Sequence, residues 1–368
     1  YNGRVKAVNT FERQLSDDGY LIIKLFLHIS KDEQAQRFEK LCDNDDTSWR
    51  VTKLDKKRHK HYDEYFDSFD DMTEKTNTAY APWNIIDATD KTFAKYQMFS
   101  IITESITKAL EEKRQPNPIN EVFPLLTMPA LADISLDDKV LSPDEYAEQL
   151  KKCQKELSKL HNRLYRAKIP MIIAFEGWDA AGKGGAIKRI ASALDPRGYE
   201  AVPISAPDKT ELAHHYLWRF WNRIPKTGHI AIFDRTWYGR VMVEKIEGFT
   251  SPQRCGQAYN EINEFEKELT DSGVIIVKFW LQIDKDEQLK RFTERQNTPE
   301  KQWKITDEDW RNREKWDSYE AAVNEMLCRT SSAYAPWNVI EANDKLYARI
   351  KVLKTVINAI NDRLDDAK

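Results

Sequence analysis

The chain repeats itself with a constant offset of 254 positions. Without any gap, residues 9–91 and 263–345 are identical at 33 of 83 positions, and the hexapeptide Ala-Tyr-Ala-Pro-Trp-Asn stands at both 79–84 and 333–338. Self-similarity at one fixed spacing indicates two copies of the same folding unit. The chain is therefore expected to form two related domains.

The second copy alternates between predicted strands and helices, which favours an α/β fold with a parallel sheet covered by helices on both faces. A polar, tryptophan-rich insertion at about 296–333 follows the fourth strand, where a helical lid over the ligand crevice is expected. The predicted strands lie near 171–177, 200–205, 229–235, 274–283 and 338–342, and the helices near 143–168, 184–194, 209–223, 256–271, 284–295 and 345–362.

A glycine-rich segment, Gly-Trp-Asp-Ala-Ala-Gly-Lys at 177–183, lies between the first predicted strand and the next helix. It fits the pattern G-x-x-x-x-G-K, in which backbone N–H groups and a helix N-terminus face an anion. The segment predicts a phosphate-binding loop, the Walker A element of a P-loop kinase-like three-layer sandwich. The expected ligands are the ammonium of Lys183 and the backbone of Gly177, Ala180, Ala181, Gly182, Gly184 and Gly185.

The loop lacks the hydroxyl that usually helps to hold Mg²⁺, because Gly184 stands where most such loops have Ser or Thr. Mg²⁺ prefers hard oxygen ligands, so Asp179 inside the loop is the candidate replacement. Asp234 ends the apolar run 229–233 and is the candidate second ligand, in the manner of a Walker B acid. The alternatives are a turn-forming role for Asp179 and a capping role for Asp234.

Several arginines are candidate ligands for the transferring phosphoryl group. Arg235 directly follows Asp234, and Arg240 lies four residues before Glu244, which could orient it. Arg189 follows the loop on its helix, with a plain surface position as the alternative. A structural ion-pair cluster is the alternative for Arg235 and Arg240.

The predicted lid and the helix before it add further cations and aromatic residues. Guanidinium groups bind phosphate in a forked geometry and aromatic rings can stack on a base. The alternative is an amphipathic helical pair with its tryptophans in the core, which we favour for Trp316 and Trp337. The candidates are Arg291 and Arg295 for phosphate, and Lys304, Trp310 and Arg313 for the nucleotide or the lid.

The first copy begins after the point where its own phosphate loop would stand. Subtracting the offset from Lys183 gives position −71, before residue 1, so residues 1–112 correspond to the C-terminal part of a copy and 113–142 to a linker. At the lid, Arg295, Trp310 and Arg313 correspond to Leu41, Lys56 and His59. The first copy is thus expected to be structural and degenerate, and residues 143–368 to form the complete catalytic domain.

Half of an α/β domain would leave a sheet edge and apolar faces uncovered. We therefore expect a missing N-terminal half-domain, or a packing partner such as a second copy in a homo-oligomer. The first residue is Tyr1, which indicates that the native start lies elsewhere.

The bulk composition excludes several classes of partner. The net charge of −3 offers no general attraction to nucleic acid or anionic membranes. No apolar stretch approaches about 18–20 residues, so no membrane span is expected. The four cysteines lack metal-ligand spacing, which favours reduced thiols in the cytoplasm.

Three ordered motifs resemble the polyphosphate kinase 2 family: 176–189 around the loop, Phe-Asp-Arg-Thr-Trp-Tyr-Gly-Arg at 233–240, and Ser-Ala-Tyr-Ala-Pro-Trp at 332–337. The resemblance covers about 143–364 and 1–110, and two fused copies resemble the polyphosphate:AMP phosphotransferase subgroup. It implies Mg²⁺ on Asp179 and Asp234, phosphates on Lys183 and Arg235, inorganic polyphosphate as donor and AMP as acceptor. Without the resemblance, the residues alone predict only Mg²⁺-dependent phosphoryl transfer.

Three other functions remain open. The chain could use a nucleoside diphosphate as acceptor and form ATP or GTP. It could be an ordinary ATP-dependent nucleotide kinase, although Gly184 argues against this. It could also be a non-catalytic polyphosphate-binding scaffold, a description that suits the first copy better than the second.

Overall fold

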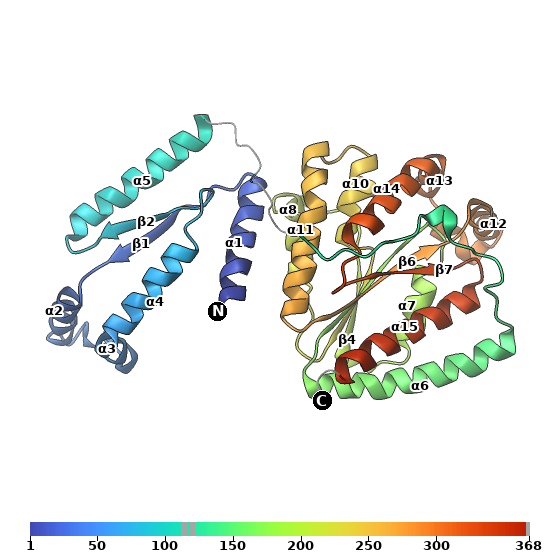
Figure 1. Cartoon of the computed structure of the whole chain (residues 1–368), viewed down its shortest axis with the longest axis horizontal. Coiled ribbons are helices and arrows are strands. Elements are labelled where there is room, and N and C mark those ends of the chain that lie inside the picture. The colour runs from blue at the N-terminus through green and yellow to red at the C-terminus, as the bar shows by residue number, and fades with distance from the viewer. Residues whose placement is uncertain (112–116, 118–121, 366–368) are drawn as a thin grey trace. The chain divides into compact units, whose positions relative to one another are not determined.

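A computed structural model describes residues 1–111, 117 and 122–365, and the chain divides into two units, residues 1–120 and 121–368 (Figure 1). The second unit contains a five-stranded, all-parallel sheet in the order β4-β5-β3-β6-β7. All five strands lie within two residues of their predicted positions. Their bounds are β3 Met171–Gly177, β4 Tyr199–Pro203, β5 Ile230–Asp234, β6 Ile275–Gln282 and β7 Trp337–Glu341.

Helices cover both faces of this sheet. On one face α15 packs on α6 and α7, and on the other α11 packs on α14. Every residue of β6 is buried, as expected for a strand covered on two sides. The helices are α6 Pro143–Ala167, α7 Lys183–Ala191, α8 Lys209–Leu212, α9 Trp218–Trp221, α10 Val243–Ile246, α11 Pro252–Asp271, α12 Lys285–Gln296, α13 Asp307–Glu314, α14 Trp316–Thr330 and α15 Lys345–Asp365.

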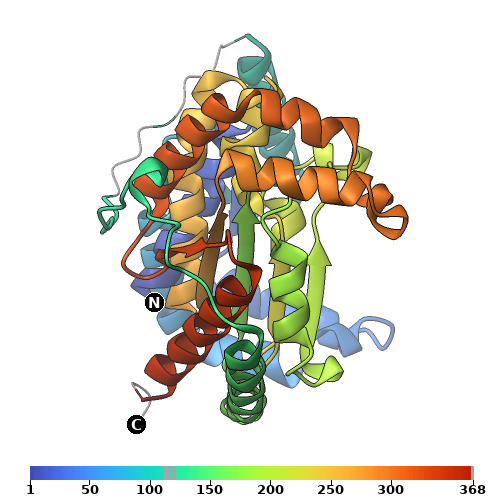
Figure 2. The ribbon, with the colours of Figure 1, turned by 90° about the vertical axis from the view of Figure 1, so that its right-hand side faces the viewer.

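The predicted lid is helical and lies beyond the carboxyl ends of the strands. In Figure 2 the orange segments from α12 to α14 stand past the arrowheads of the sheet. The short helix η5 Pro299–Lys304 connects α12 to α13. A Thr306–Asp309 capping box starts α13, so the sequence signal for the break in the lid is local.

The helix predicted at 209–223 does not form as one piece. It is divided into the one-turn helices α8 and α9, and the segment between them carries His215 and Leu217 into the interior. His215 Nε2 lies 3.5 Å from Glu261 Oε2, and Leu217 has no exposed surface. No Gly or Pro marks this break, so packing rather than local propensity decides it.

Part of the predicted linker at 113–142 belongs to the second unit. Leu125 bridges to Ser332, and the backbone N–H of Leu126 donates to the Ser331 carbonyl at 2.7 Å. Leu131 is 2% exposed and joins the main core. The backbone after residue 121 thus pairs with the second unit. Residues 113–116 and 118–121 of the predicted linker lie outside the described part.

The first unit reproduces the last two strands of the second. Its strands pair in parallel with Lys24 opposite Trp83, and Lys278 is opposite Trp337 in the second unit, 254 positions later in both strands. Its elements are α1 Asn2–Asp17, β1 Lys24–His28, α2 Lys31–Cys42, η1 Ser48–Arg50, α3 Lys53–Lys60, α4 Tyr62–Lys75, β2 Trp83–Asp87 and α5 Lys91–Glu111.

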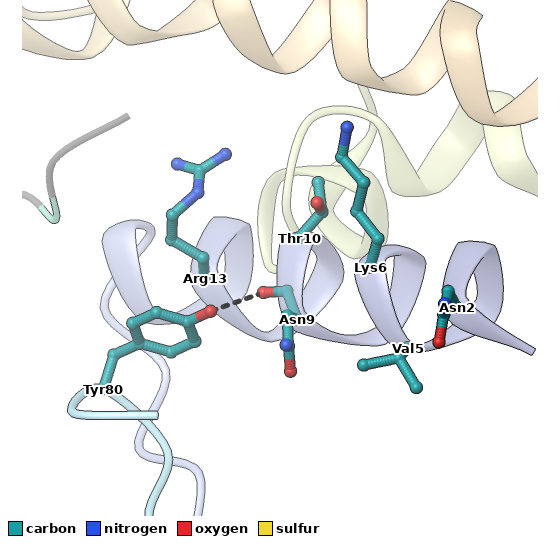
Figure 3. Close-up of a pocket in the computed structure, with 7 residues that line it drawn as sticks. All are labelled: Asn2, Val5, Lys6, Asn9, Thr10, Arg13 and Tyr80. Carbon is teal, nitrogen blue, oxygen red and sulfur yellow. Dashed lines mark hydrogen bonds between the residues drawn. The ribbon is translucent and has the colours of Figure 1, made fainter. Parts of the chain in front are cut away.

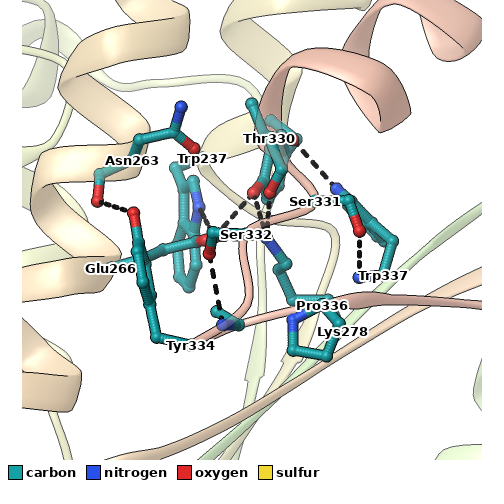
Figure 4. Close-up of polar contacts among 12 residues, drawn as sticks. Trp237, Asn263, Glu266, Lys278, Thr330, Ser331, Ser332, Tyr334, Pro336 and Trp337 are labelled. Atoms are coloured by element: carbon teal, nitrogen blue, oxygen red, sulfur yellow. Dashed lines mark hydrogen bonds and ion pairs between the residues drawn. The ribbon is translucent and has the colours of Figure 1, made fainter. Parts of the chain in front are cut away.

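Residues that are identical in the two copies make the same polar contacts. Lys278 donates to Glu266 and to the Thr330 carbonyl (Figure 4), and Lys24 donates to Glu12 and to the Thr76 carbonyl. In the first unit Tyr80 donates to the Asn9 carbonyl at 2.9 Å, beside a hollow of about 390 Å³ on α1 (Figure 3). The bond from Tyr334 to Asn263 has the same length. The repeated residues are therefore a structural frame.

Helix α5 lacks the cover that its counterpart has. Phe99 is 70% exposed, whereas its counterpart Leu353 on α15 is fully buried. Tyr96 is also 70% exposed, against 3% for its counterpart Ile350. The expectation of an uncovered apolar face on the first unit therefore matches its geometry, while the identity of what covers it stays a prediction.

Candidate active site

The phosphate loop joins the end of β3 to the start of α7. Three of its residues have positive φ: Gly177 at 149°, Ala180 at 64° and Gly182 at 110°. Such alternation turns successive N–H groups towards one point, which is how a backbone nest binds an anion. A Cβ on Gly177 would lie 2.7 Å from the Leu281 carbonyl oxygen, so the close approach of β6 also requires glycine there.

Lys183 lies over its own loop. Its ammonium donates to the carbonyls of Gly177 at 2.5 Å and Trp178 at 3.2 Å. The indole of Trp178 stacks on Trp316 of α14, with ring centroids 3.7 Å apart, and donates to Gln282. The loop is thereby anchored to the lid helices, and Trp316 is buried as the sequence favoured.

Asp179 and Asp234 stand at the ends of two adjacent strands. β5 pairs with β3 so that Asp234 is opposite Phe175, four residues before Asp179. One carboxylate oxygen of Asp179 lies 3.7 Å from Arg235, and the other accepts from Asn312 of α13 at 3.0 Å. The structure therefore brings Asp179, Asp234 and Arg235 to one edge of the loop.

The donors at this edge fit Mg²⁺ by their chemistry. Both are carboxylates, and Mg²⁺ binds through one or two carboxylates while phosphate oxygens and water complete its shell. Within the described ranges, no group of three or more His, Cys, Asp or Glu side chains is placed to hold a metal. A metal here would depend on these two acids.

Glu176 is a site residue that the sequence analysis missed. It is 5% exposed, and its Oε1 accepts from both the backbone N–H and the hydroxyl of Thr236, each at 2.7 Å. Arg235, between Asp234 and Thr236, has a φ of 67°, a strained conformation for arginine that its surroundings must hold. Burial raises the pKa of Glu176 to about 7. The sequence signal that could have identified Glu176 is an acidic residue at the end of an otherwise apolar strand.

Arg240 and Arg189 have protein partners. Arg240 pairs with Glu244 at 2.6 Å, as the spacing predicted, and its guanidinium lies 4.4 Å from the Tyr216 ring centroid. Arg189 donates to the Tyr146 hydroxyl and to the Gly185 carbonyl. Phosphate binding by these two arginines stays a prediction.

Arg291 is fully engaged by the protein. Its Nε donates to Glu287, its Nη1 to the loop carbonyls of Ala180 and Ala181, and its Nη2 to the carbonyls of Ala342 and Asn343. A guanidinium has five N–H donors, and all five have acceptors. A contact between Arg291 and phosphate would have to break one of these bonds, so its geometry favours holding the loop in place.

The remaining lid candidates divide into two groups. Arg295 and Lys304 line a cavity of about 250 Å³ together with loop residues. Trp310 packs edge-on against Phe292, and Arg313 donates to the Lys285 carbonyl and to Gln288; neither lines this cavity. Of the five lid-side cations and aromatics, the structure thus brings three to the loop: Arg295 and Lys304, which line the cavity, and Arg291, which holds the loop carbonyls.

Comparisons with known proteins agree with this geometry. The sequence profile described as Polyphosphate kinase 2 matches residues 1–115 and 140–368. A polyphosphate:AMP phosphotransferase of Pseudomonas aeruginosa is 44% identical over 360 residues, which are 97% of this chain and 72% of that protein. A GDP-polyphosphate phosphotransferase of Mycolicibacterium smegmatis is 38% identical over 220 residues, 60% of this chain and 78% of that protein.

The fold comparison covers both units. A crystal structure of a polyphosphate kinase 2 from Pseudomonas aeruginosa aligns with a TM-score of 0.80 and 41% identity, over 99% of this chain and 72% of that one. Among the helices of the described ranges, none is long and apolar enough to cross a membrane.

Proposed function

Because the chain belongs to the polyphosphate kinase 2 family, we propose that it moves a phosphoryl group from inorganic polyphosphate to AMP and forms ADP. The choice of AMP rests on the relative that matches across both units, which is named for this reaction. The choice of phosphoryl transfer rests on one observation: the nest of the loop, Lys183, Asp179 and Arg235 meet at the ends of β3 and β5.

The reaction requires positioning and neutralisation of charge more than covalent chemistry. The loop N–H groups and Lys183 would hold the donor phosphates. Arg235, which is half-exposed beside Asp179, would approach the transferring group. The AMP phosphate is already an anion, so no residue has to remove a proton from it.

Glu176 supports Arg235 in this scheme. By accepting two hydrogen bonds from Thr236, it holds the bend that directs Arg235 towards Asp179. The N–H of Arg235 itself donates to the Phe175 carbonyl at 3.1 Å, so the end of β3 secures both residues of the bend. Glu176 is thus a positioning residue.

Mg²⁺ is the proposed cofactor, with Asp179 and Asp234 as its protein ligands. When bound, the ion would neutralise charge on the phosphate oxygens at this edge of the loop. Gly184 has no side-chain hydroxyl to offer a metal, which supports assigning that role to the two acids. All four cysteines are free, which supports the expected cytoplasmic setting.

A nucleoside diphosphate acceptor is the second candidate. The Mycolicibacterium smegmatis relative is named for GDP and matches 60% of this chain. A nucleoside diphosphate acceptor is therefore compatible with membership of this family.

The test compares donors and acceptors in one assay. The protein is incubated with Mg²⁺ and with AMP, ADP or GDP in turn, with polyphosphate in one series and ATP in another, and the nucleotide product is measured, which is ADP when AMP is the acceptor. We expect ADP only with polyphosphate. ADP formed only with ATP would refute the polyphosphate donor, and product with ADP or GDP but not AMP would favour the second candidate. No product with any acceptor would favour a scaffold.

A further inference from the structure

The lid helix α13 contacts the candidate metal ligand Asp179 directly. The side-chain amide of Asn312, on α13, donates to Asp179 Oδ2 at 3.0 Å. The Asp179 side chain is 18% exposed, and its other oxygen, Oδ1, lies 3.7 Å from the Arg235 guanidinium. An ionised carboxylate offers about four acceptor sites. The bond from Asn312 therefore occupies one of them and leaves Oδ1 on the β5 side, where Asp234 ends the strand.

The amide of Asn312 is oriented by a second lid residue. Its oxygen accepts from the Tyr319 hydroxyl of α14 at 3.3 Å. Because an ionised carboxylate can only accept hydrogen bonds, the amide nitrogen must face Asp179 and the amide oxygen must face Tyr319. Burial, together with the carboxylates of Glu247 and Asp179, raises the pKa of Tyr319 to about 12, so its hydroxyl stays protonated at neutral pH. The hydrogen bonds thus run in one direction, from Tyr319 through Asn312 to Asp179.

The next residue of α13 holds the main chain of the same aspartate. Arg313 donates to Gln288 Oε1 at 3.1 Å, and Gln288 Nε2 donates to the Asp179 carbonyl at 3.2 Å. In addition, Trp316 at the start of α14 stacks on Trp178, which precedes Asp179 in the loop. The side chain of Asp179, its carbonyl and the residue before it are therefore all held by contacts that lead to the lid.

The duplication indicates that the lid does not need an amide at this position in order to fold. The first unit keeps the counterpart of the glutamine contact, since Gln34 Oε1 lies 2.8 Å from His59 Nδ1. Arg58 stands there at the position of Asn312, and the corresponding segment is still the helix α3. The contact that distinguishes the amide of Asn312 is therefore the one with Asp179.

We infer that Asn312 is a positioning residue of the proposed metal site: it fixes one oxygen of Asp179, presents the other to Mg²⁺, and so makes metal binding depend on the lid. This inference rests on the proposed function, in which Asp179 and Asp234 are the Mg²⁺ ligands. A carboxylate that rotates freely has to be ordered when a metal binds, and a hydrogen bond that already fixes it removes this cost. By linkage, a lid that favours metal binding is in turn stabilised by the metal.

The first experiment measures metal binding with no substrate present. Mn²⁺ is titrated into the wild type, Asn312→Ala and Asn297→Ala, and the free ion is followed by electron paramagnetic resonance. Asn312→Ala should bind Mn²⁺ about tenfold more weakly than the wild type. Asn297→Ala is the matched control, because Asn297 is an exposed asparagine at the end of α12, and it should bind like the wild type. Equal affinity in Asn312→Ala and the wild type, or no binding by the wild type, would overturn the inference.

A double-mutant cycle tests whether Tyr319 acts through Asn312. Tyr319→Phe should weaken Mn²⁺ binding less than Asn312→Ala does, because it removes only the group that orients the amide. In the Asn312→Ala background the same change should have no further effect. An equal effect of Tyr319→Phe in both backgrounds would overturn the directed chain of hydrogen bonds.

Hydrogen exchange tests the dependence on the lid. Mg²⁺ should slow amide exchange in α13 of the wild type and not in α13 of Asn312→Ala. Alanine is a better helix former than asparagine, so α13 should remain helical in the variant. A purely structural role of Asn312 would alter exchange in α13 equally with and without Mg²⁺, and that result would refute the dependence.

The Mg²⁺ dependence of ADP formation separates this inference from the proposed function. Asn312→Ala should need about tenfold more Mg²⁺ for half of its maximal rate, whereas its KM for AMP at saturating Mg²⁺ should not change. An unchanged Mg²⁺ requirement would overturn the inference and leave the proposed function in place. Weaker Mn²⁺ binding by Asn312→Ala, with no ADP formed by the wild type from any donor, would support the inference while the proposed function failed.

Discussion

Replacing Lys278 with methionine provides a sharp test of how the second unit is held together. Lys278 has no exposed surface, and its ammonium donates to Glu266 at 2.7 Å and to the Thr330 carbonyl at 2.8 Å (Figure 4). It also donates to the Tyr238 hydroxyl at 2.8 Å. Methionine keeps most of the side-chain volume but removes the charge. The buried carboxylate of Glu266 would then lack its cation.

The expected cost follows from burial. Burial raises the pKa of Glu266 and lowers that of Lys278 despite their contact, so each group is shifted towards its neutral form. The pair therefore contributes little net stability, but removing one member leaves the other buried without an ionic partner. Such a loss costs about 3–5 kcal/mol. The double variant Lys278→Met with Glu266→Gln should recover at least half of this, because the amide oxygen can still accept from Tyr238 and Trp237.

The assay is urea unfolding followed by tryptophan fluorescence, with activity checked before denaturation. Nine of the eleven tryptophans lie in the second unit, so the main transition reports on it. The repeat supplies the control Lys24→Met, whose pair with Glu12 is 9% and 14% exposed and which should leave that transition in place. A cost below about 1 kcal/mol for Lys278→Met, or a double variant as unstable as the single one, would refute the reasoning.

Three further predictions concern the loop. Asp179→Asn and Lys183→Ala should each lower kcat about 100-fold or more with unchanged circular dichroism; retained activity would mean that the site lies elsewhere. Gly177→Ala should cost at least about 2 kcal/mol of unfolding free energy, because its Cβ would meet Leu281 at a φ of 149°, whereas Gly256→Ala, with open space on α11, should not destabilise. The Glu176 pKa of about 7 lies above the reference value of 4.5, so the folded state binds this proton more tightly than the unfolded state. The free energy of unfolding should therefore fall by up to about 3 kcal/mol as pH rises from about 4.5 to 7. Denaturation at several pH values should show this fall in the wild type and not in Glu176→Gln.

Local patterns predicted most of the fold correctly. Four of the five strands of the second unit, all but β4, are short, largely apolar runs that end at or within two residues of a glycine or an acidic residue. Such runs have few alternatives inside a parallel sheet. The duplication added a check that needs no other sequence, since the β1–β2 register repeats in β6–β7. The prediction of one continuous helix at 209–223 was wrong. Burial of Leu217 in the core overrides the local helix propensity of this segment.

The sequence by itself determined the loop, its lysine and the two acids, because the loop directly follows β3, Asp234 ends β5, and parallel strands end at one edge. Only the tertiary structure decided what surrounds them. Arg291 reaches the loop carbonyls over about 110 positions, and Arg349 reaches Gly185 from the last helix. Which helix lies beside the loop depends on the strand order, and no local pattern encodes an order that arises from packing over such distances.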